Sequence, residues 1–321
     1  MNENSATKGD FTAVVLANKH IRSCYYRLTL QFFQDGARAF AAARPGQFAE
    51  FDLSGVSVPP AEKLDEQQAE MVQRDIILRR PFSFCDITAK DGQATVEVLY
   101  CAVGPASLRM TTLKPADKIN ILGPLGNGFS MPQGKKTALL VIGGMGAPPI
   151  QHLAITNSRQ NKDLYQLVFA GAKTKFYLPF EGRIDEISSQ IGFPIHDFAR
   201  HGIESQLATD DGSAGFAGPV TQCLKQWLDE NANETKPEQI VIYACGPEAM
   251  LAEVAKIAAA KKIDCQVSME RRMACGIGVC QSCAVECRTD DGKTEYKLCC
   301  KDGPVFDAKQ VVFEKKIDAI L

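Results

Sequence analysis

The stretch "TALLVIGGMGAPPIQHLAITNSRQ", residues 137–160, separates two halves of the chain that have different sequence patterns. It opens with an unbroken apolar run, which is typical of a strand buried in a parallel sheet. A glycine-containing corner follows, and the residues from Ala147 onward can continue as a helix. A strand that leads directly into a helix is the repeating unit of doubly wound α/β sheets, so the stretch predicts that fold.

The residues after this unit continue the alternation of strands and helices. Helices are predicted at 219–232 and at 247–262, the second being rich in alanine with a proline in its first turn. Short apolar runs predict further strands at 164–171, 203–210, 238–246 and 264–269. We therefore expect an α/β domain over residues 133–264, followed by a cysteine-rich module over residues 265–321.

The first 130 residues have a β pattern instead. Runs rich in branched and aromatic residues predict strands within 11–17, 25–32, 46–53, 75–84, 94–103 and 117–126. Six such runs without a convincing helix favour a small antiparallel barrel or sandwich over residues 10–132. The polar segment 54–75 interrupts the pattern, and we expect a surface insertion there with one or two helical turns.

The composition limits which binding partners the protein can have and in which cell compartment we expect it. The 321 residues carry a formal charge of −2, which gives no electrostatic basis for binding nucleic acid or an anionic membrane. The polar N-terminus lacks the apolar core of a signal peptide, and no apolar run approaches the length of a membrane span. We expect a cytoplasmic protein.

Half of the 12 cysteines lie within residues 275–300. Cys275, Cys280 and Cys283 have the C-x4-C-x2-C spacing of plant-type [2Fe-2S] clusters, which also need a fourth cysteine further along the chain. Thiolates suit iron because they are soft, anionic donors, and the intervening glycines let backbone amides approach the sulfurs. The spacing leaves the fourth ligand open among Cys287, Cys299 and Cys300, although adjacent residues in an extended chain point to opposite faces.

Zinc is the main alternative occupant of these cysteines. In a reducing cytoplasm, regularly spaced cysteines are more often metal ligands or redox groups than disulfides. None of the four histidines lies near them, which disfavours a mixed Cys/His zinc site or a Rieske centre. Zinc sites usually have two short cysteine knuckles, and the second is missing here. The pattern favours iron and sulfide, with a zinc-stabilised binding protein or a thiol-based redox sensor as alternatives.

A cluster of this kind carries electrons singly, whereas a nicotinamide gives up a hydride, so a flavin is expected between the two. "RRPFSF" ends a predicted strand with Arg80 and Ser83, whose side chains suit flavin phosphates and the flavin ring, although an ordinary strand end would look the same. Two strand-to-helix corners are candidate nicotinamide sites or simply tight turns. They contain Gly143, Gly144 and Gly146 in the first corner and Cys245, Gly246 and Pro247 in the second.

Taken together, the motifs resemble those of a known family. "RRPFSF", "GPLGNGF", "GGMGAPP", "ATDDGS", "ACGPEAML", "RRMACGIGVCQSC" and "CKDGPVFDA", in this order, are similar to the electron-transfer subunits of class 1B dihydroorotate dehydrogenases. The resemblance covers most of residues 10–315, and its cysteine segment is the most specific part. It also extends to ferredoxin–NADP reductases, which implies an FAD-binding barrel followed by an NAD-binding α/β domain.

The resemblance implies particular residues for each cofactor. It selects Cys300, which precedes x-D-G-P, as the fourth cluster ligand. Cys101 stands where the family has an arginine, and Gly104-Pro105-Ala106-Ser107 stands where the family has a Gly-x-Gly-Thr turn. The implied FAD contacts are Arg80, Pro81, Phe82, Ser83, Leu99, Tyr100, Cys101, Ala106 and Ser107.

The implied function is electron transfer between NAD(H), FAD, the [2Fe-2S] cluster and a separate FMN-containing catalytic subunit. That subunit would interconvert dihydroorotate and orotate in pyrimidine biosynthesis, within a heterotetramer of two plus two subunits. No acid–base catalytic residue is expected. The small subunits of NADH-dependent ferredoxin:NADP oxidoreductase and of sulfide dehydrogenase share this layout and are the alternative.

Overall fold

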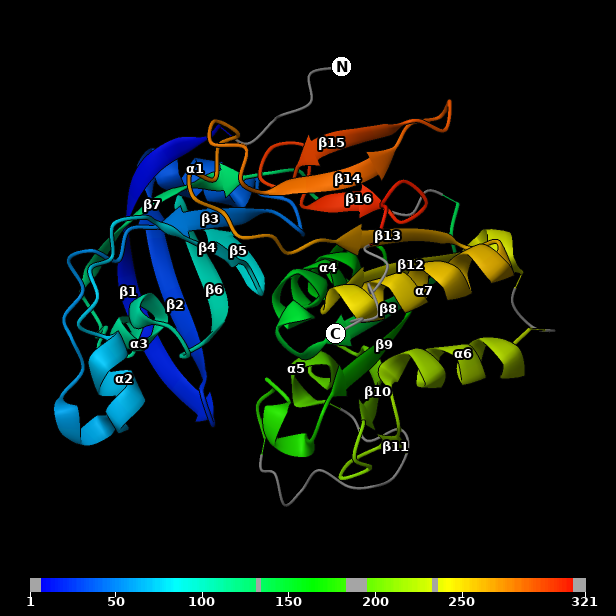
Figure 1. Cartoon of the computed structure of the whole chain (residues 1–321), viewed down its shortest axis with the longest axis horizontal. Coiled ribbons are helices and arrows are strands. Elements are labelled where there is room, and N and C mark those ends of the chain that lie inside the picture. The colour runs from blue at the N-terminus through cyan, green and yellow to red at the C-terminus, as the bar shows by residue number, and fades with distance from the viewer. Residues whose placement is uncertain (1–6, 131–133, 183–194, 233–235, 314–321) are drawn as a thin grey trace, which may run out of the picture.

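The computed structural model describes residues 7–130, 134–182, 195–232 and 236–313 (Figure 1). Its first sheet is wholly antiparallel, with the strand order β4-β3-β7-β1-β2-β6-β5. The prediction of an antiparallel β domain is confirmed, and the curled sheet forms a half-barrel. Its strands are β1 (Gly9–Arg22), β2 (Tyr25–Phe33), β3 (Phe48–Phe51), β4 (Arg80–Ser83), β5 (Asp86–Lys90), β6 (Gln93–Cys101) and β7 (Lys118–Leu125).

Short helices complete this half of the molecule. Alternate residues of β2, such as Leu28, Leu30 and Phe32, are fully buried, as the period of a half-buried strand requires. Phe40 of α1 (Gln34–Ala41) stacks on Phe32 with ring centroids 3.9 Å apart and covers the inside of the curled sheet. The predicted helical turns in the 54–75 segment are confirmed by a 3-10 turn (Ala61–Lys63) and α2 (Glu66–Met71), while α3 (Pro105–Met110) follows β6.

The second sheet has the order β11-β10-β9-β8-β12-β13-β16 and is parallel except for its last strand. It confirms the predicted doubly wound α/β fold. Its strands are β8 (Thr137–Gly143), β9 (Tyr165–Ala172), β10 (Glu204–Thr209), β11 (Phe216–Ala217), β12 (Ile240–Cys245), β13 (Asp264–Ser268) and β16 (Val305–Asp307). Its helices are α4 (Ala147–Gln160), α5 (His196–Ala199), α6 (Val220–Glu230) and α7 (Glu248–Lys261).

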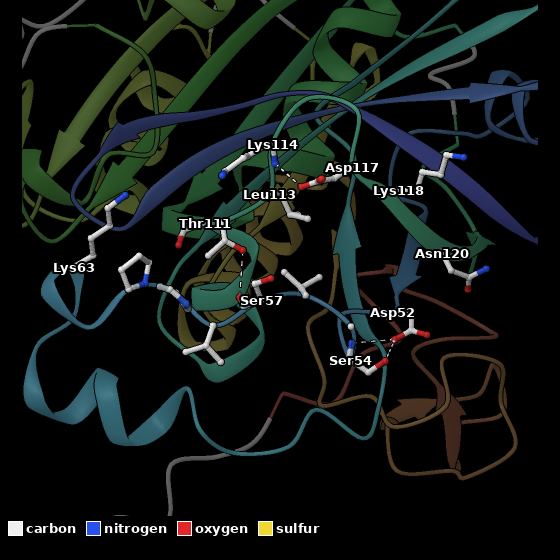
Figure 2. Close-up of a pocket in the computed structure, with 16 residues that line it drawn as sticks. Asp52, Ser54, Ser57, Lys63, Thr111, Leu113, Lys114, Asp117, Lys118 and Asn120 are labelled. Atoms are coloured by element: carbon white, nitrogen blue, oxygen red, sulfur yellow. Dashed lines mark hydrogen bonds between the residues drawn. The ribbon is translucent and has the colours of Figure 1, made fainter.

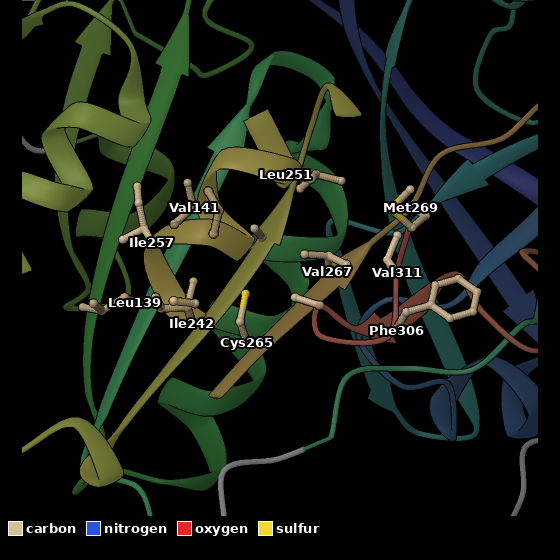
Figure 3. Packing of buried hydrophobic residues seen from close by; sticks show 14 of the residues in the cluster. Leu139, Val141, Ile242, Leu251, Ile257, Cys265, Val267, Met269, Phe306 and Val311 are labelled. Atoms are coloured by element: carbon tan, nitrogen blue, oxygen red, sulfur yellow. The ribbon is translucent and has the colours of Figure 1, made fainter. Parts of the chain in front are cut away.

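Helices cover both faces of this sheet. Leu140 and Ile142 of β8 pack in one apolar cluster with α4 and α5, whereas Leu139 and Val141 pack in another with α6 and α7 (Figure 3). Both faces of β8 are therefore buried, which explains the unbroken apolar run in its sequence.

The cysteine-rich segment is built into this second core. A hairpin of β14 (Ala284–Arg288) and β15 (Thr294–Leu298) follows the cysteine loop, and Val285 and Cys287 pack in the same cluster as α7. β13, which begins at Asp264, and β16, which follows the cysteines, are hydrogen-bonded strands of the second sheet. The cysteine loop thus leaves from the edge of the α/β layer and runs toward the half-barrel (Figure 1).

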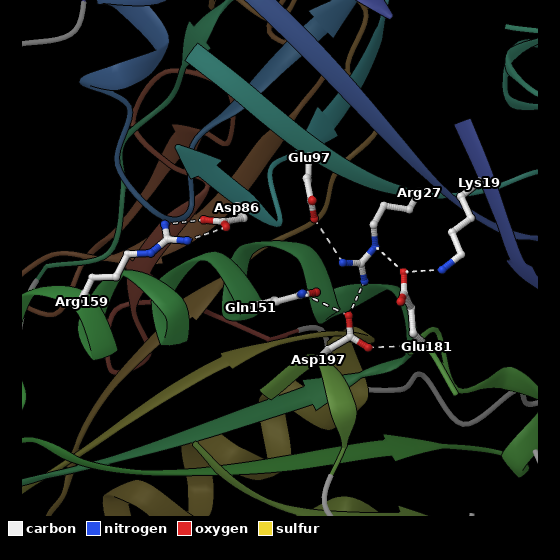
Figure 4. A network of polar contacts seen from close by, with 8 residues as sticks. All are labelled: Lys19, Arg27, Asp86, Glu97, Gln151, Arg159, Glu181 and Asp197. Atoms are coloured by element: carbon white, nitrogen blue, oxygen red, sulfur yellow. Dashed lines mark hydrogen bonds and ion pairs between the residues drawn. The ribbon is translucent and has the colours of Figure 1, made fainter. Parts of the chain in front are cut away.

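Two ion pairs, one buried and one partly exposed, join the half-barrel to the α/β part (Figure 4). Arg27 of β2 is 5% exposed and pairs with Asp197 of α5, which is 1% exposed, and with Glu97 of β6 at 3.1 Å. Asp86, which begins β5, accepts two hydrogen bonds of 2.7 Å from Arg159 of α4. Charges that are removed from water need partners, so these pairs fix the orientation of the two parts.

Among the helices of the described residues, none has the length and the apolar character of a membrane span.

Candidate functional site

A cleft of about 730 Å³ lies between the half-barrel and the α/β part. Its barrel side includes Arg80, Pro81 and Phe82 from β4, and its other side includes Arg271 and Arg272 from the segment that precedes the cysteines. Apolar surface combined with several guanidinium groups suits a ligand that has a flat ring and phosphates. The residues present therefore fit a flavin dinucleotide.

The structure brings most, but not all, of the predicted flavin residues to this cleft. Cys101, Ala106 and Ser107 line it together with the three β4 residues. Leu99, Tyr100 and Ser83 are not among its lining residues. Leu99 and Tyr100 are buried, and the phenol of Tyr100 donates a hydrogen bond to Asn18 inside the half-barrel.

A second cavity of about 680 Å³ opens at the carboxyl ends of β8, β9 and β10. The chain reverses its direction across the sheet between β8 and β12, and ligands of open α/β sheets bind at such switch points. Gly143, Gly144 and Pro247 line this cavity, as does Asp210, a carboxylate that the sequence reasoning did not single out. Pro247 lines both cavities, so the two binding regions meet at this residue.

The remaining residues of the two strand-to-helix corners, after β8 and after β12, pack the two corners against each other. A Cβ on Gly146 would lie 2.0 Å from the carbonyl oxygen of Cys245, so only glycine allows this approach of the two strand ends. Neither Gly146 nor Cys245 lines the second cavity, and Gly246 lines only the first. Burial raises the pKa of the Cys245 thiol to about 12, which keeps it protonated.

The predicted cluster residues meet in two pairs, three of them from the cysteine loop between β13 and β14 and Cys300 from the turn after β15. The amide of Cys280 donates to the sulfur of Cys275, and the amide of Cys300 donates to the sulfur of Cys283, both at 3.4 Å. A two-iron cluster takes two thiolates at each iron, so a pairwise arrangement suits it. Within the described residues, no three or more His, Cys, Asp or Glu side chains are gathered closely enough to hold a metal ion.

The other two cysteines of the segment face elsewhere. The thiol of Cys299 donates to the carbonyl oxygen of Met269 at 3.2 Å, and Cys287 is buried in the core under β14. Cys280, in contrast, is exposed, and hydrogen bonds from the hydroxyl and the backbone of Ser282 lower its pKa to about 6. A thiol that ionises readily is a ready metal ligand. The hydrogen bonds thus pair Cys275 with Cys280 and Cys283 with Cys300, and they leave Cys287 and Cys299 outside both pairs.

Glu50 of β3 links the cysteine loop to the cleft, and the sequence reasoning missed it. Gly276 has φ +67° and packs so closely on Glu50 that a Cβ would lie 2.5 Å from its carboxylate. Glu50 is also the ladder partner of Pro81, one of the residues that line the cleft. It is fully buried, neither carboxylate oxygen has a hydrogen-bond partner in the described residues, and burial raises its pKa to about 7. A single strand therefore separates the cysteine loop from the predicted flavin motif.

A further cavity lies away from all of these motifs. It measures about 800 Å³ and is formed by the 54–75 insertion and the segment that includes Thr111 and Lys118 (Figure 2). Several of its polar groups are already engaged, because Asp52 accepts hydrogen bonds from Ser54 and Asp117 accepts one from the amide of Lys114. None of the predicted site residues lines it.

The fold is that of the ferredoxin reductases. The structure of the NADH-dependent reduced ferredoxin–NADP oxidoreductase matches with a TM-score of 0.67 and 23% identity, over 94% of this chain and 90% of that one. Phthalate dioxygenase reductase, described as transferring electrons from pyridine nucleotides to [2Fe-2S], matches with a TM-score of 0.53 and 12% identity, over 91% and 78%. At these identities the likeness defines the class of fold alone.

Sequence similarity then defines the family. Residues 270–312 match the model of the iron-sulfur cluster binding domain of dihydroorotate dehydrogenase B. The electron transfer subunit of dihydroorotate dehydrogenase B (NAD(+)) from Bacillus caldolyticus is 34% identical over 301 residues, or 93% of this chain and 96% of the relative. That from Caldanaerobacter subterraneus is 32% identical over 94% and 98%. The chain belongs to the family of dihydroorotate dehydrogenase B electron transfer subunits, as its motifs indicated.

Proposed function

We propose that the chain is an NAD(H)-linked oxidoreductase subunit that carries electrons between NAD(H) and a separate FMN-containing dihydroorotate dehydrogenase subunit. When bound, FAD exchanges a hydride with the nicotinamide and single electrons with the [2Fe-2S] cluster. In this proposal residues 10–132 bind FAD, residues 133–264 bind NAD(H) and residues 265–321 hold the cluster. The reaction that it serves is the oxidation of dihydroorotate to orotate in pyrimidine biosynthesis.

The contact between Gly276 and Glu50 carries this proposal. It sets the cysteine loop one strand away from Pro81, and Pro247 joins the cleft to the second cavity. The three candidate sites therefore form a continuous series in the order of the electron path. The chain's own residues position the groups, with arginines such as Arg80 for the phosphates and four thiolates for the iron.

The partner is proposed to dock over the cysteine loop. Ile277 and Val279 are 50% and 74% exposed and directly precede the exposed Cys280 in the loop. Exposed apolar side chains next to a redox group suit a protein interface that shortens the path for electrons. We expect a heterotetramer of two copies of each subunit.

The experiment combines the reconstituted chain with the catalytic subunit and compares it with the Cys280→Ser variant. We expect the variant to retain reduction of its flavin by NADH, because the cleft is unchanged, while dihydroorotate-dependent reduction of NAD falls to background. If the variant delivered electrons to the partner at the normal rate, the cluster would have no part in the path.

The small subunit of an NADH-dependent ferredoxin:NADP oxidoreductase remains the second candidate, because of the structural likeness over nearly the whole chain. Purification of the chain with its native partner separates the two. A dihydroorotate dehydrogenase supports the first function, and a large second flavoprotein with additional iron–sulfur clusters supports the second.

A further inference from the structure

Cys24 and Cys101 are a second place where two thiols meet. Cys24 lies in the tight turn between β1 and β2, and Cys101 is the last residue of β6. Their sulfur atoms are 2.7 Å apart, although the residues are 77 positions apart in the sequence. A disulfide bond is about 2.05 Å long, so a shift of less than about 1 Å would let the two sulfurs bond.

The backbone already holds the two cysteines side by side. Tyr25, which follows Cys24, is the ladder partner of Cys101, and the amide of Ala102 donates to the carbonyl oxygen of Cys24 at 2.7 Å. Because these contacts hold the turn with Cys24 beside the end of β6, only a small movement is needed to bridge the two sulfurs. Both are partly exposed, so small reagents in solution can reach them.

We propose that Cys24 and Cys101 form a reversible dithiol–disulfide site whose oxidant is a low-molecular-weight disulfide such as oxidised glutathione. One cysteine thiolate attacks a sulfur of the oxidant, which forms a mixed disulfide and releases one glutathione thiolate. The second cysteine thiolate attacks the protein sulfur of that mixed disulfide and releases the second glutathione. The two protein thiols lose two electrons and two protons, and one oxidised glutathione becomes two glutathione thiols.

The site lies in the wall of the cleft. Cys101 lines the cleft together with Arg80 and Phe82, so oxidation would alter a side chain on the surface of the proposed flavin site. Burial and the neighbouring Cys24 raise the pKa of Cys101, so little of it is thiolate at neutral pH. We therefore expect the disulfide to form slowly at neutral pH and faster in alkaline solution.

Peptide mapping of the full-length protein under anaerobic conditions tests the proposal. The protein is equilibrated with oxidised or reduced glutathione, alkylated and digested with trypsin without reduction. We expect oxidised glutathione to link the tryptic peptides "SCYYR" (residues 23–27) and "DGQATVEVLYCAVGPASLR" (residues 91–109), and reduced glutathione to separate them again. Recovery of the two peptides only as alkylated thiols or separate glutathione adducts would overturn the proposal.

Two variants serve as controls. Cys24→Ser should abolish the linked peptide and leave glutathione attached to Cys101, because the second thiol that resolves the mixed disulfide is gone. Cys223→Ser removes a buried thiol in α6 and should leave the linked peptide at the wild-type yield. A linked peptide that also disappeared in Cys223→Ser would contradict the assignment of the pair.

Discussion

Cys299 and Cys300 are neighbours in the chain with different surroundings. The sequence predicts three cluster ligands from their spacing, and adjacency alone says only that these two cysteines face opposite ways. In the structure the amide of Cys300 donates a hydrogen bond to the sulfur of Cys283, while the thiol of Cys299 donates one to the carbonyl oxygen of Met269. This distinction depends on how the chain turns after β15, which residue spacing does not contain.

The two cysteines should therefore differ when replaced. We expect Cys300→Ser to lose most of its iron and acid-labile sulfide after anaerobic reconstitution, because one of four thiolates is missing. Cys299→Ser should retain both, since a serine hydroxyl can still donate to Met269. Iron and sulfide analysis of the two purified variants measures this, and the reverse pattern would move the fourth ligand to Cys299.

Glu50 shows what residue-level reasoning from sequence missed. In "GQFAEF" a glutamate within a predicted strand would ordinarily face water, yet it is fully buried beneath the cysteine loop. Only the packing of Gly276 against β3 reveals this position.

This burial predicts a pH-dependent stability. The pKa of Glu50 is raised from 4.5 to about 7, so between these values the folded protein keeps a proton that the unfolded chain has lost. The free energy of unfolding therefore decreases as the pH rises through this window, because the folded state binds the proton more tightly than the unfolded chain does. Glu50→Gln should remove the penalty and become more stable than wild type by up to about 3 kcal/mol near pH 8, with little difference near pH 4.

Denaturant unfolding of both proteins across this pH range measures the difference. A stability difference that did not change with pH would mean that Glu50 is not the buried titrating group.

At the level of elements, strands with strong patterns and the helical turns of the 54–75 segment were predictable, whereas the short helix α1 was not. The unbroken apolar run of β8 and the alanine-rich α7 are strong signals, and both form as expected. α1 has eight residues, includes Gly36 and has no side-chain cap at its N-terminus, so its sequence carries no clear signal of where a helix begins. Its packing against β2 and β6 stabilises it instead.

The role of the "GPLGNGF" motif is seen only in the structure. By sequence Asn127-Gly128 indicates a turn. In the structure the Asn127 amide nitrogen donates to the carbonyl oxygens of Asp302 and Val305, and its oxygen accepts from the Val305 amide. The end of β7 is thereby attached to the segment that follows the last cluster cysteine.

Asn127→Ala should weaken this attachment. Loss of three hydrogen bonds that leave backbone groups without partners should lower the free energy of unfolding by about 1–3 kcal/mol. Asn231→Ala, which removes one hydrogen bond to Trp227 at the end of α6, is the matched control. Thermal unfolding of the two variants measures the effect, and equal destabilisation would argue against a special role for Asn127.

The arrangement of the whole molecule was the part least accessible to sequence. The order of a barrel, an α/β domain and a cysteine module was predictable, because each has its own pattern. Their relative placement depends on pairs such as Arg27 with Asp197, which are 170 positions apart and look like ordinary surface charges in the sequence. Likewise, β16 connects the cysteine module to the second sheet through hydrogen bonds to β13, and no local sequence pattern predicts this pairing.

The exposed apolar residues of the cysteine loop face outward from the assembled chain and form part of the surface of the whole molecule. We expect Val279→Asp to weaken binding of the catalytic subunit by at least about tenfold, since it places a charge in the proposed interface. Val58→Asp, on the remote insertion, should bind normally. Titration of the partner by calorimetry measures both, and equal affinities would move the interface away from the cysteine loop.

The absorption spectrum of the anaerobically reconstituted protein, recorded before and after NADH is added, tests the central claim most directly. The account predicts flavin bands on a broad iron–sulfur background, with both bleached by NADH, because the three sites form one series. A protein that remained colourless after reconstitution, or a bound flavin that NADH did not reduce, would contradict it.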